Sequence, residues 1–68
     1  MLTVSEIKKM FGKEIKVILS DGLVFHGTLT GFYDKYDTMS GSDEIELDIG
    51  KSYVGLEVGD IISAEIVS

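Results

Sequence analysis

KVILSDGLVFHGTLTGF, at residues 16–32, is the most informative stretch of this sequence. Apolar residues alternate with polar ones on both sides of Asp21-Gly22. This pair is typical of the two-residue type I′ turn of a β-hairpin, which needs a positive φ at both positions. Gly27 and Gly31 interrupt the second strand, and glycine inside a strand indicates a bulge or a sharp bend. The stretch therefore predicts a hairpin whose second strand, residues 23–32, curves through two sheets of a small barrel.

A short helix is predicted before the hairpin, at residues 3–12. Thr3 and Glu6 have the spacing of a capping box, and Leu2 and Ile7 have that of a hydrophobic staple. Gly12 stands where a left-handed residue commonly ends a helix. Apolar residues recur at helical spacing along one face, so the helix is expected to lie on the rest of the protein.

Strand-like alternation covers most of the remaining sequence. It predicts strands at residues 14–19, 44–49, 53–58 and 61–67 in addition to the second strand of the hairpin. The residues expected on the core face are Ile15, Val17, Leu19, Leu23, Phe25, Leu29, Ile45, Leu47, Ile49, Val54, Leu56 and Val58. Residues 1–68 are thus predicted to form one mainly β domain. In it, the helix at 3–12 precedes a five-stranded, strongly bent antiparallel SH3-like barrel at 14–67.

The charge is acidic and unevenly distributed. The net charge is −6, from six lysines, no arginine and twelve acidic residues. Residues 1–33 hold four lysines and three acids, whereas residues 34–68 hold two lysines and nine acids. Binding of phosphate groups depends on clustered basic residues, so long-range attraction to nucleic acid or to an anionic membrane is disfavoured.

Composition also bears on stability, chemistry and location. A chain of 68 residues buries only a modest core, and without cysteine it has no disulfide, so oligomerisation is the expected source of added stability. No nucleophile–base pair, glycine-rich phosphate loop or set of metal ligands is recognisable, so we expect no catalysis, cofactor or metal. The start of the sequence lacks the pattern of a signal peptide, which predicts a cytoplasmic protein.

The hairpin and the preceding capped helix resemble the first motif of Sm-like proteins, including the bacterial host-factor branch. That motif has an apolar strand, an Asp-Gly turn, an apolar residue before a glycine, a leucine and then a bend. Asp21-Gly22, Phe25, Gly27, Leu29 and Gly31-Phe32 match it here. The resemblance implies a homo-oligomer, assembled as a ring by pairing strand four of one copy with strand five of the next. It also implies single-stranded RNA as a ligand at the pore.

The resemblance places the RNA-binding positions of the first motif at Tyr33, Tyr36 and Asp37. The second motif of the family, an apolar residue followed by Arg or Lys and then Gly, falls on Glu57-Val58-Gly59. Asp37 replaces an asparagine, and a carboxylate cannot donate a hydrogen bond. Val58 replaces the basic residue. Tyr33, Tyr36, Asp37 and Gly59 are therefore the candidate RNA-binding residues at the pore, with Lys8 and Lys9 as a basic patch on the helix.

Each candidate also has a structural interpretation. Tyr33 and Tyr36 could pack on their own barrel or on a neighbouring subunit instead of stacking on bases. Lys8 and Lys9 could be the solvated side of the helix. His26 lies opposite the core face without a second metal ligand, which predicts a surface or interface histidine.

Two functions follow from these observations. The first is an oligomeric binding module that associates with RNA, as the resemblance implies. The second is an acidic interaction scaffold that displays carboxylates to a basic protein and binds no RNA. Those carboxylates are Glu44, Glu46, Asp48 and Glu57. The alternation of Glu44, Glu46 and Asp48 is better explained by the solvated face of a strand.

Overall fold

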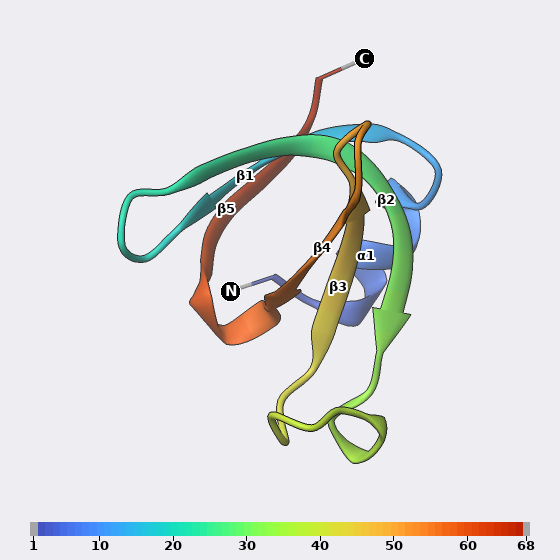
Figure 1. The fold of residues 1–68 in the computed structure, drawn as a ribbon, viewed down its shortest axis with the longest axis vertical. Helices are drawn as coiled ribbons and strands as arrows, with labels where there is room; N and C mark the ends of the chain where they lie inside the picture. The colour runs from blue at the N-terminus through green and yellow to red at the C-terminus, as the bar shows by residue number, and fades with distance from the viewer. Residues whose placement is uncertain (1, 68) are drawn as a thin grey trace.

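The fold, described for residues 2–67 in a computed structural model, contains one short helix and five antiparallel strands (Figure 1). Two single-turn 3-10 helices interrupt the connections between strands. In chain order the elements are α1 (Val4–Met10), β1 (Glu14–Leu19), β2 (Val24–Tyr33), η1 (Lys35–Asp37), β3 (Glu44–Asp48), β4 (Tyr53–Glu57), η2 (Val58–Asp60) and β5 (Ile61–Ile66). The predicted mainly β fold with an N-terminal helix is confirmed.

The helix begins as the sequence predicts and ends slightly earlier. The Thr3 hydroxyl accepts a hydrogen bond from the Glu6 N–H (3.2 Å), and Glu6 Oε1 accepts one from the Thr3 N–H (3.0 Å). This reciprocal pair is a capping box. Gly12 has the predicted left-handed backbone, at φ +76°. Its N–H donates to the carbonyl of Leu29, so the end of the helix is fixed to β2 (2.9 Å).

The hairpin turn differs from the predicted type I′ turn. Gly22 has a φ of +91°, but no residue other than glycine has a positive φ in the described chain, so Asp21 does not adopt the type I′ conformation. The Gly22 N–H donates to the Leu19 carbonyl (2.9 Å) and the Leu19 N–H to the Leu23 carbonyl (2.8 Å). The loop is therefore three residues long, and its left-handed residue is glycine, which has no Cβ to clash.

The long strand β2 bends and joins two parts of the sheet. Its first half pairs with β1 and its second half with β3, and the register shifts between Leu29 and Gly31. Gly27 allows the neighbouring strand to come close, because a Cβ there would lie 2.7 Å from the Asp48 carbonyl oxygen. The predicted bend of this strand is confirmed.

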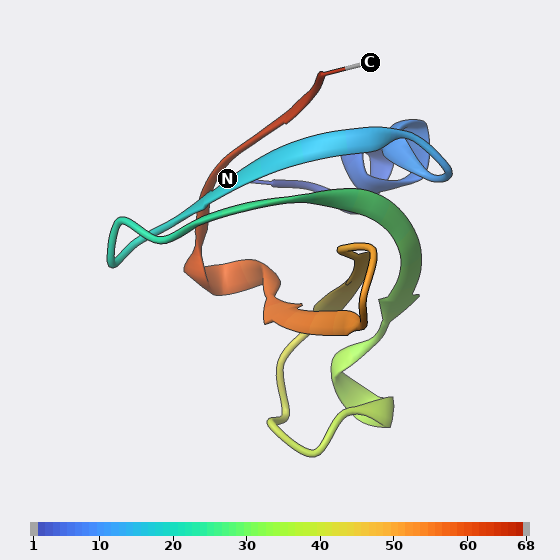
Figure 2. The ribbon, with the colours of Figure 1, turned by 45° about the horizontal axis from the view of Figure 1, so that its top comes forward.

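The strands form one sheet in the order β4-β3-β2-β1-β5. The sheet curls over a single core, and η2 connects its two edge strands (Figure 2). Within residues 2–67 no ladder of hydrogen bonds joins β4 to β5, so the structure shows a bent sheet, and closure into a barrel stays a prediction. β4 and β5 each have a neighbouring strand on one side only.

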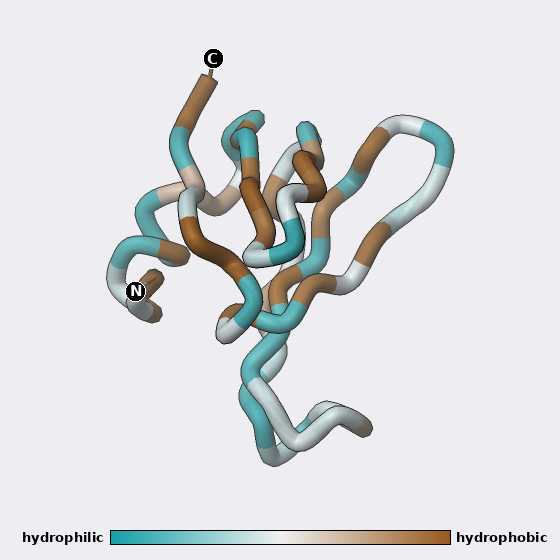
Figure 3. The backbone as a smooth tube through the Cα atoms, turned by 90° about the vertical axis from the view of Figure 1, so that its left-hand side faces the viewer, coloured by the Kyte–Doolittle hydropathy of each residue, from teal (hydrophilic) through white to brown (hydrophobic). Residues whose placement is uncertain are grey.

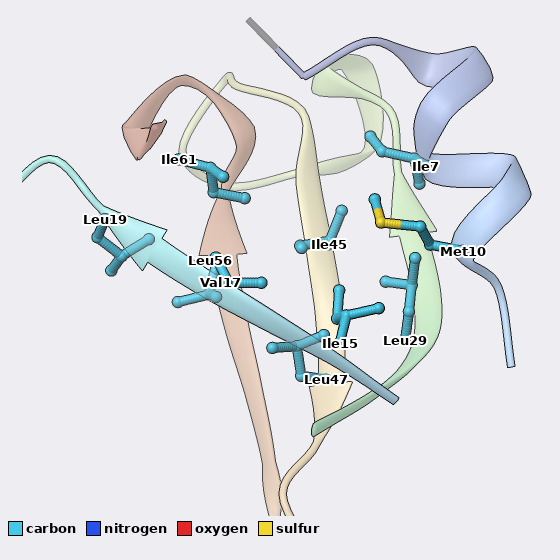
Figure 4. Packing of buried hydrophobic residues seen from close by; sticks show 10 residues of the cluster. All are labelled: Ile7, Met10, Ile15, Val17, Leu19, Leu29, Ile45, Leu47, Leu56 and Ile61. Carbon is cyan, nitrogen blue, oxygen red and sulfur yellow. The ribbon is translucent and has the colours of Figure 1, made fainter. Parts of the chain in front are cut away.

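The core lies inside the curled sheet and under α1 (Figure 4). Its buried members are Ile7, Met10, Ile15, Val17, Leu19, Leu29, Ile45, Leu47, Leu56 and Ile61. Phe25, Val54 and Val58 are partly buried against it.

Two residues predicted for the core are largely exposed. Leu23 is 55% exposed because it lies at the tip of the hairpin, and β3 pairs with β2 only from Thr28 onward. Ile49 is 41% exposed because β3 ends at Asp48 and Ile49 already begins the next turn. The prediction that these two side chains are buried is wrong.

Candidate functional site

The loop between β2 and β3, residues 34–43, carries most of the candidate binding residues and is called the Tyr36 loop here. It projects from the body of the molecule (Figure 1) and is mostly hydrophilic (Figure 3). Tyr33 is the last residue of β2, and Asp34 caps η1 by accepting a hydrogen bond from the Tyr36 N–H at its Oδ1 (2.9 Å). The turn after β2 therefore follows from a local side-chain cap of the kind that Asp commonly makes.

Tyr36 is the most accessible tyrosine of the site. Its side chain is 84% exposed, and the Nζ atom of Lys35 lies 5.3 Å from the centre of its ring. A cation at this distance from an aromatic ring is attracted by the negative charge of the ring face. At this exposure Tyr36 does not pack on its own sheet, so the interpretation that it packs on its own barrel is wrong. Contact with a ligand and contact with another subunit both remain.

Tyr33 is held more closely than Tyr36. It is 45% exposed, and a Cβ at Gly31 would lie 3.3 Å from its Cε2 atom. Its ring therefore covers the glycine of the β2 bend, and only part of it is open to a partner.

Asp37 brings negative charge next to the accessible tyrosine. Its N–H donates to the Asp34 carbonyl (2.8 Å), and the residue is exposed. Asp34 and Asp43 lie in the same loop, Glu44 follows it at the start of β3, and Lys35 is the single lysine of the loop. The site therefore combines an exposed aromatic side chain with neighbouring carboxylates, and their negative charge repels phosphate groups.

The structure brings the Tyr36 loop next to the turn that contains Gly59. Asp43 Oδ1 accepts a hydrogen bond from the Lys35 N–H (2.8 Å), and the Asp43 carbonyl accepts one from the Val58 N–H (2.9 Å). Gly59 lies in η2, where an added Cβ would meet nothing within 4 Å. The two motif segments are thus joined. The sequence did not single out Asp43, since an aspartate after a Ser-Gly-Ser turn has no distinctive pattern.

Lys8 and Lys9 lie apart from these two segments. Both are exposed and occupy the last turn of α1, where positive charge complements the helix dipole. In Figure 2, α1 lies at the top of the molecule and the Tyr36 loop at the bottom. A single copy therefore offers the two lysines and the tyrosines on separate surfaces.

The four carboxylates of the predicted acidic scaffold share one face of the sheet. Pairing places Glu44 opposite Glu57, Glu46 opposite Gly55 and Asp48 opposite Tyr53. Directly opposed residues of antiparallel strands point to the same side, and the alternate residues Ile45 and Leu47 are buried. This outer surface of β3 and β4 is the acidic face.

Hollows also lie outside the Tyr36 loop and η2. A cleft of about 390 Å³ is lined by residues that include Glu14, His26, Thr28 and Asp48. A second hollow of about 350 Å³ runs between α1 and β5 beside Met10. Within residues 2–67, no three histidine, aspartate or glutamate side chains come close enough together to hold a metal ion.

Comparison with protein families, with curated proteins and with solved structures finds no match to this chain. Among the described residues, no helix has the length and apolar character required to cross a membrane.

Proposed function

We propose that this protein is a non-enzymatic, self-assembling binding module of the Sm-like kind, with single-stranded RNA as the ligand that the resemblance implies. The strand order carries this proposal, because β4 and β5 are the two edges of the sheet. An edge strand presents unpaired N–H and C=O groups to any strand that can pair with it. Pairing of β5 with β4 of another copy would extend the sheet from copy to copy and could close a ring.

Exposed apolar side chains along β5 support assembly at this edge. Ile62 is 67% exposed, and Ile66 at the end of β5 and Val67 just after it are each nearly half exposed. A domain with so small a core gains stability when such residues are buried between subunits.

Assembly is tested by placing a charge on this edge. Ile62→Lys is expected to convert an oligomer to a monomer in sedimentation velocity, because a lysine on an edge strand disfavours further pairing. Leu23→Lys is the matched control, since Leu23 is similarly exposed but lies at the hairpin tip. A monomeric wild type, or an Ile62→Lys variant that assembles like wild type, contradicts the proposal.

The RNA part of the proposal depends on Tyr36 and on repetition of the helix lysines. Base stacking on an aromatic side chain contributes about 1–3 kcal/mol and accepts any base, and Tyr36 is open for it. A ring would also repeat Lys8 and Lys9 in every copy, and multivalency strengthens weak contacts. The proposed contact residues are Tyr36, Lys8 and Lys9 on these grounds, together with Tyr33, Asp37 and Gly59, which the resemblance implies.

RNA binding is tested by fluorescence anisotropy with a mixed-sequence single-stranded RNA of about ten nucleotides, a length typical of such sites. The affinity should fall steeply with salt, and Tyr36→Ala should weaken binding about 5- to 100-fold. Charge reversal of both Lys8 and Lys9 to Glu should abolish binding. Lys51→Glu, which makes the same kind of change in the turn between β3 and β4, serves as the control. Unchanged affinity in the Lys8/Lys9 variant excludes this version.

The acidic face favours a second function, that of a scaffold for a basic protein. Glu44, Glu46, Asp48 and Glu57 lie together on the outer surface of β3 and β4, and complementary charge favours association with a basic surface. A basic protein that copurifies, together with indifference to RNA, would mark this function. If such a complex survives replacement of Glu44, Glu46 and Asp48 by lysine, the scaffold function is excluded.

A further inference from the structure

The Tyr36 loop is ordered by hydrogen bonds and not by packing. No residue of η1 is buried, Tyr36 is exposed, and Met39 near the tip of the loop is fully exposed. No large apolar side chain of η1 or of the loop tip therefore anchors this segment to the core.

Hydrogen bonds inside the loop hold its shape. Asp34 Oδ1 accepts from the Tyr36 N–H (2.9 Å), and the Thr38 hydroxyl donates to the Ser42 carbonyl (2.7 Å). Side-chain to backbone bonds of this kind fix a loop locally. They do not determine how the loop is placed relative to the rest of the protein.

The link to the rest of the protein passes through Asp43. Its carboxylate accepts from the Lys35 N–H at the start of η1 (2.8 Å), and its carbonyl accepts from the Val58 N–H at the start of η2 (2.9 Å). One residue thus bonds to both candidate contact segments. Because the next residue, Glu44, begins β3, the link is also continuous with the rigid sheet.

We propose that Asp43 is a positioning residue, whose carboxylate holds η1, and with it Tyr36, at the start of β3, next to the point where the Asp43 carbonyl binds η2. The ligand that Tyr36 would contact depends on the proposed function, whereas the link between the two segments does not. A surface fixed before binding loses less conformational entropy when the ligand arrives. Loss of the Asp43 carboxylate should leave the bonds made by Asp34 and Thr38 and the bond between the Asp43 carbonyl and Val58 in place, but should free η1 to move relative to β3 and η2.

Amide hydrogen exchange measured by NMR tests the link. In Asp43→Ala, exchange at Lys35, and at Tyr36 and Asp37, whose N–H groups bond to Asp34, is expected to be roughly three- to ten-fold faster, the effect of losing one hydrogen bond. Asp43→Asn keeps a carbonyl acceptor and should restore the wild-type rates. Exchange in β1 and β5, which lie at the other side of the sheet, should not change in either variant.

Two further variants separate positioning from general destabilisation. Asp48→Ala is the matched control, because Asp48 Oδ1 accepts the Gly50 N–H in the turn at the other end of β3 (2.9 Å). It should loosen that turn and leave the Tyr36 loop unchanged. Lys35→Pro removes the donor of the Asp43 bond at the first position of η1, where proline is tolerated. It should loosen the loop as Asp43→Ala does, even if the alanine variant does not fold.

The results distinguish this inference from the proposed function. Unchanged exchange in the loop of Asp43→Ala, equal acceleration throughout the sheet, or no rescue by Asp43→Asn overturns the positioning role. The RNA probe is then titrated with the same variants, and Asp43→Ala should bind about three- to ten-fold more weakly, with rescue by Asp43→Asn. If the wild type does not bind the RNA, the proposed ligand fails, and the exchange data alone decide the role of Asp43.

Discussion

Gly27 illustrates how a single residue allows two strands to come close. The sequence indicates a special backbone position at this glycine, and the structure shows the Asp48 carbonyl where a Cβ would lie, whereas the register of β2 shifts further along, between Leu29 and Gly31. The neighbouring turn shows the limit of prediction at this level. Asp-Gly fits a type I′ turn and also a three-residue loop that ends in a left-handed glycine. The sequence alone therefore did not distinguish the two turns, and the hydrogen bonds of Leu19 identify the three-residue loop.

Replacement of Gly27 by alanine is expected to destabilise the protein by about 1–3 kcal/mol, because the new Cβ would overlap the backbone of Asp48. Urea unfolding measures the effect. Gly59→Ala is the control, because Gly59 has open space around it and no positive φ. Its stability should change by less than about 0.5 kcal/mol. Equal effects of the two substitutions would show that Gly27 does not lie against β3.

At the level of helices and strands, alternation predicts the middle of an element better than its ends. Ile15, Val17, Ile45 and Leu47 are buried as predicted. Leu23 and Ile49 have the same alternation but are exposed. Leu23 lies at the hairpin tip, where β3 does not pair with β2, and Ile49 lies after the end of β3. Period-two alternation assigns a face of the strand, and burial also requires another element opposite that face.

Ile45→Val and Ile49→Val test this distinction with the same change in side-chain volume. Ile45 is fully buried, so its replacement should lower the free energy of unfolding by about 0.5–1.5 kcal/mol. The change at Ile49 should be close to zero. Thermal unfolding of both variants provides the comparison. A larger loss of stability in Ile49→Val than in Ile45→Val would show that Ile49 packs in the core.

The capping box makes the stability of α1 depend on pH. Hydrogen bonds from the Thr3 backbone and hydroxyl hold the pKa of Glu6 below its ordinary value of 4.5. The stabilisation from this carboxylate is therefore complete above the ordinary pKa and is lost as the pH falls through the lower pKa of the folded state. Glu6→Gln should show a smaller loss of thermal stability between neutral and acid pH than wild type. Parallel pH profiles would contradict this cause.

At the level of the whole molecule, the alternation of the sequence predicts five strands. How the strands pair between copies is inferred only from the family resemblance. The observed order makes β4 and β5 the edges of the sheet. The candidate site is predictable in part, because motif positions indicate Tyr36 and Gly59. The link between them depends on the carbonyl and carboxylate of Asp43. Every residue has a backbone carbonyl, so the residue types do not indicate which carbonyl accepts a hydrogen bond, and this part of the site could not be predicted from the sequence.

The separation of Lys8 and Lys9 from the Tyr36 loop also matters at this level. One copy presents the two lysines and the Tyr36 loop on different surfaces (Figure 2). An RNA molecule that contacts both would therefore have to run over more than one surface of an assembly. RNA association therefore depends on self-assembly through the sheet edges.

A native mass spectrum of the protein, purified gently from its own cells, shows whether the protein assembles through these edges. We expect a closed oligomer whose mass is an integral multiple of the chain mass, because both sheet edges are available for pairing. An additional bound mass would identify the ligand as RNA or as a protein. A monomer at every concentration would contradict assembly through β4 and β5, and the proposed RNA association would fall with it.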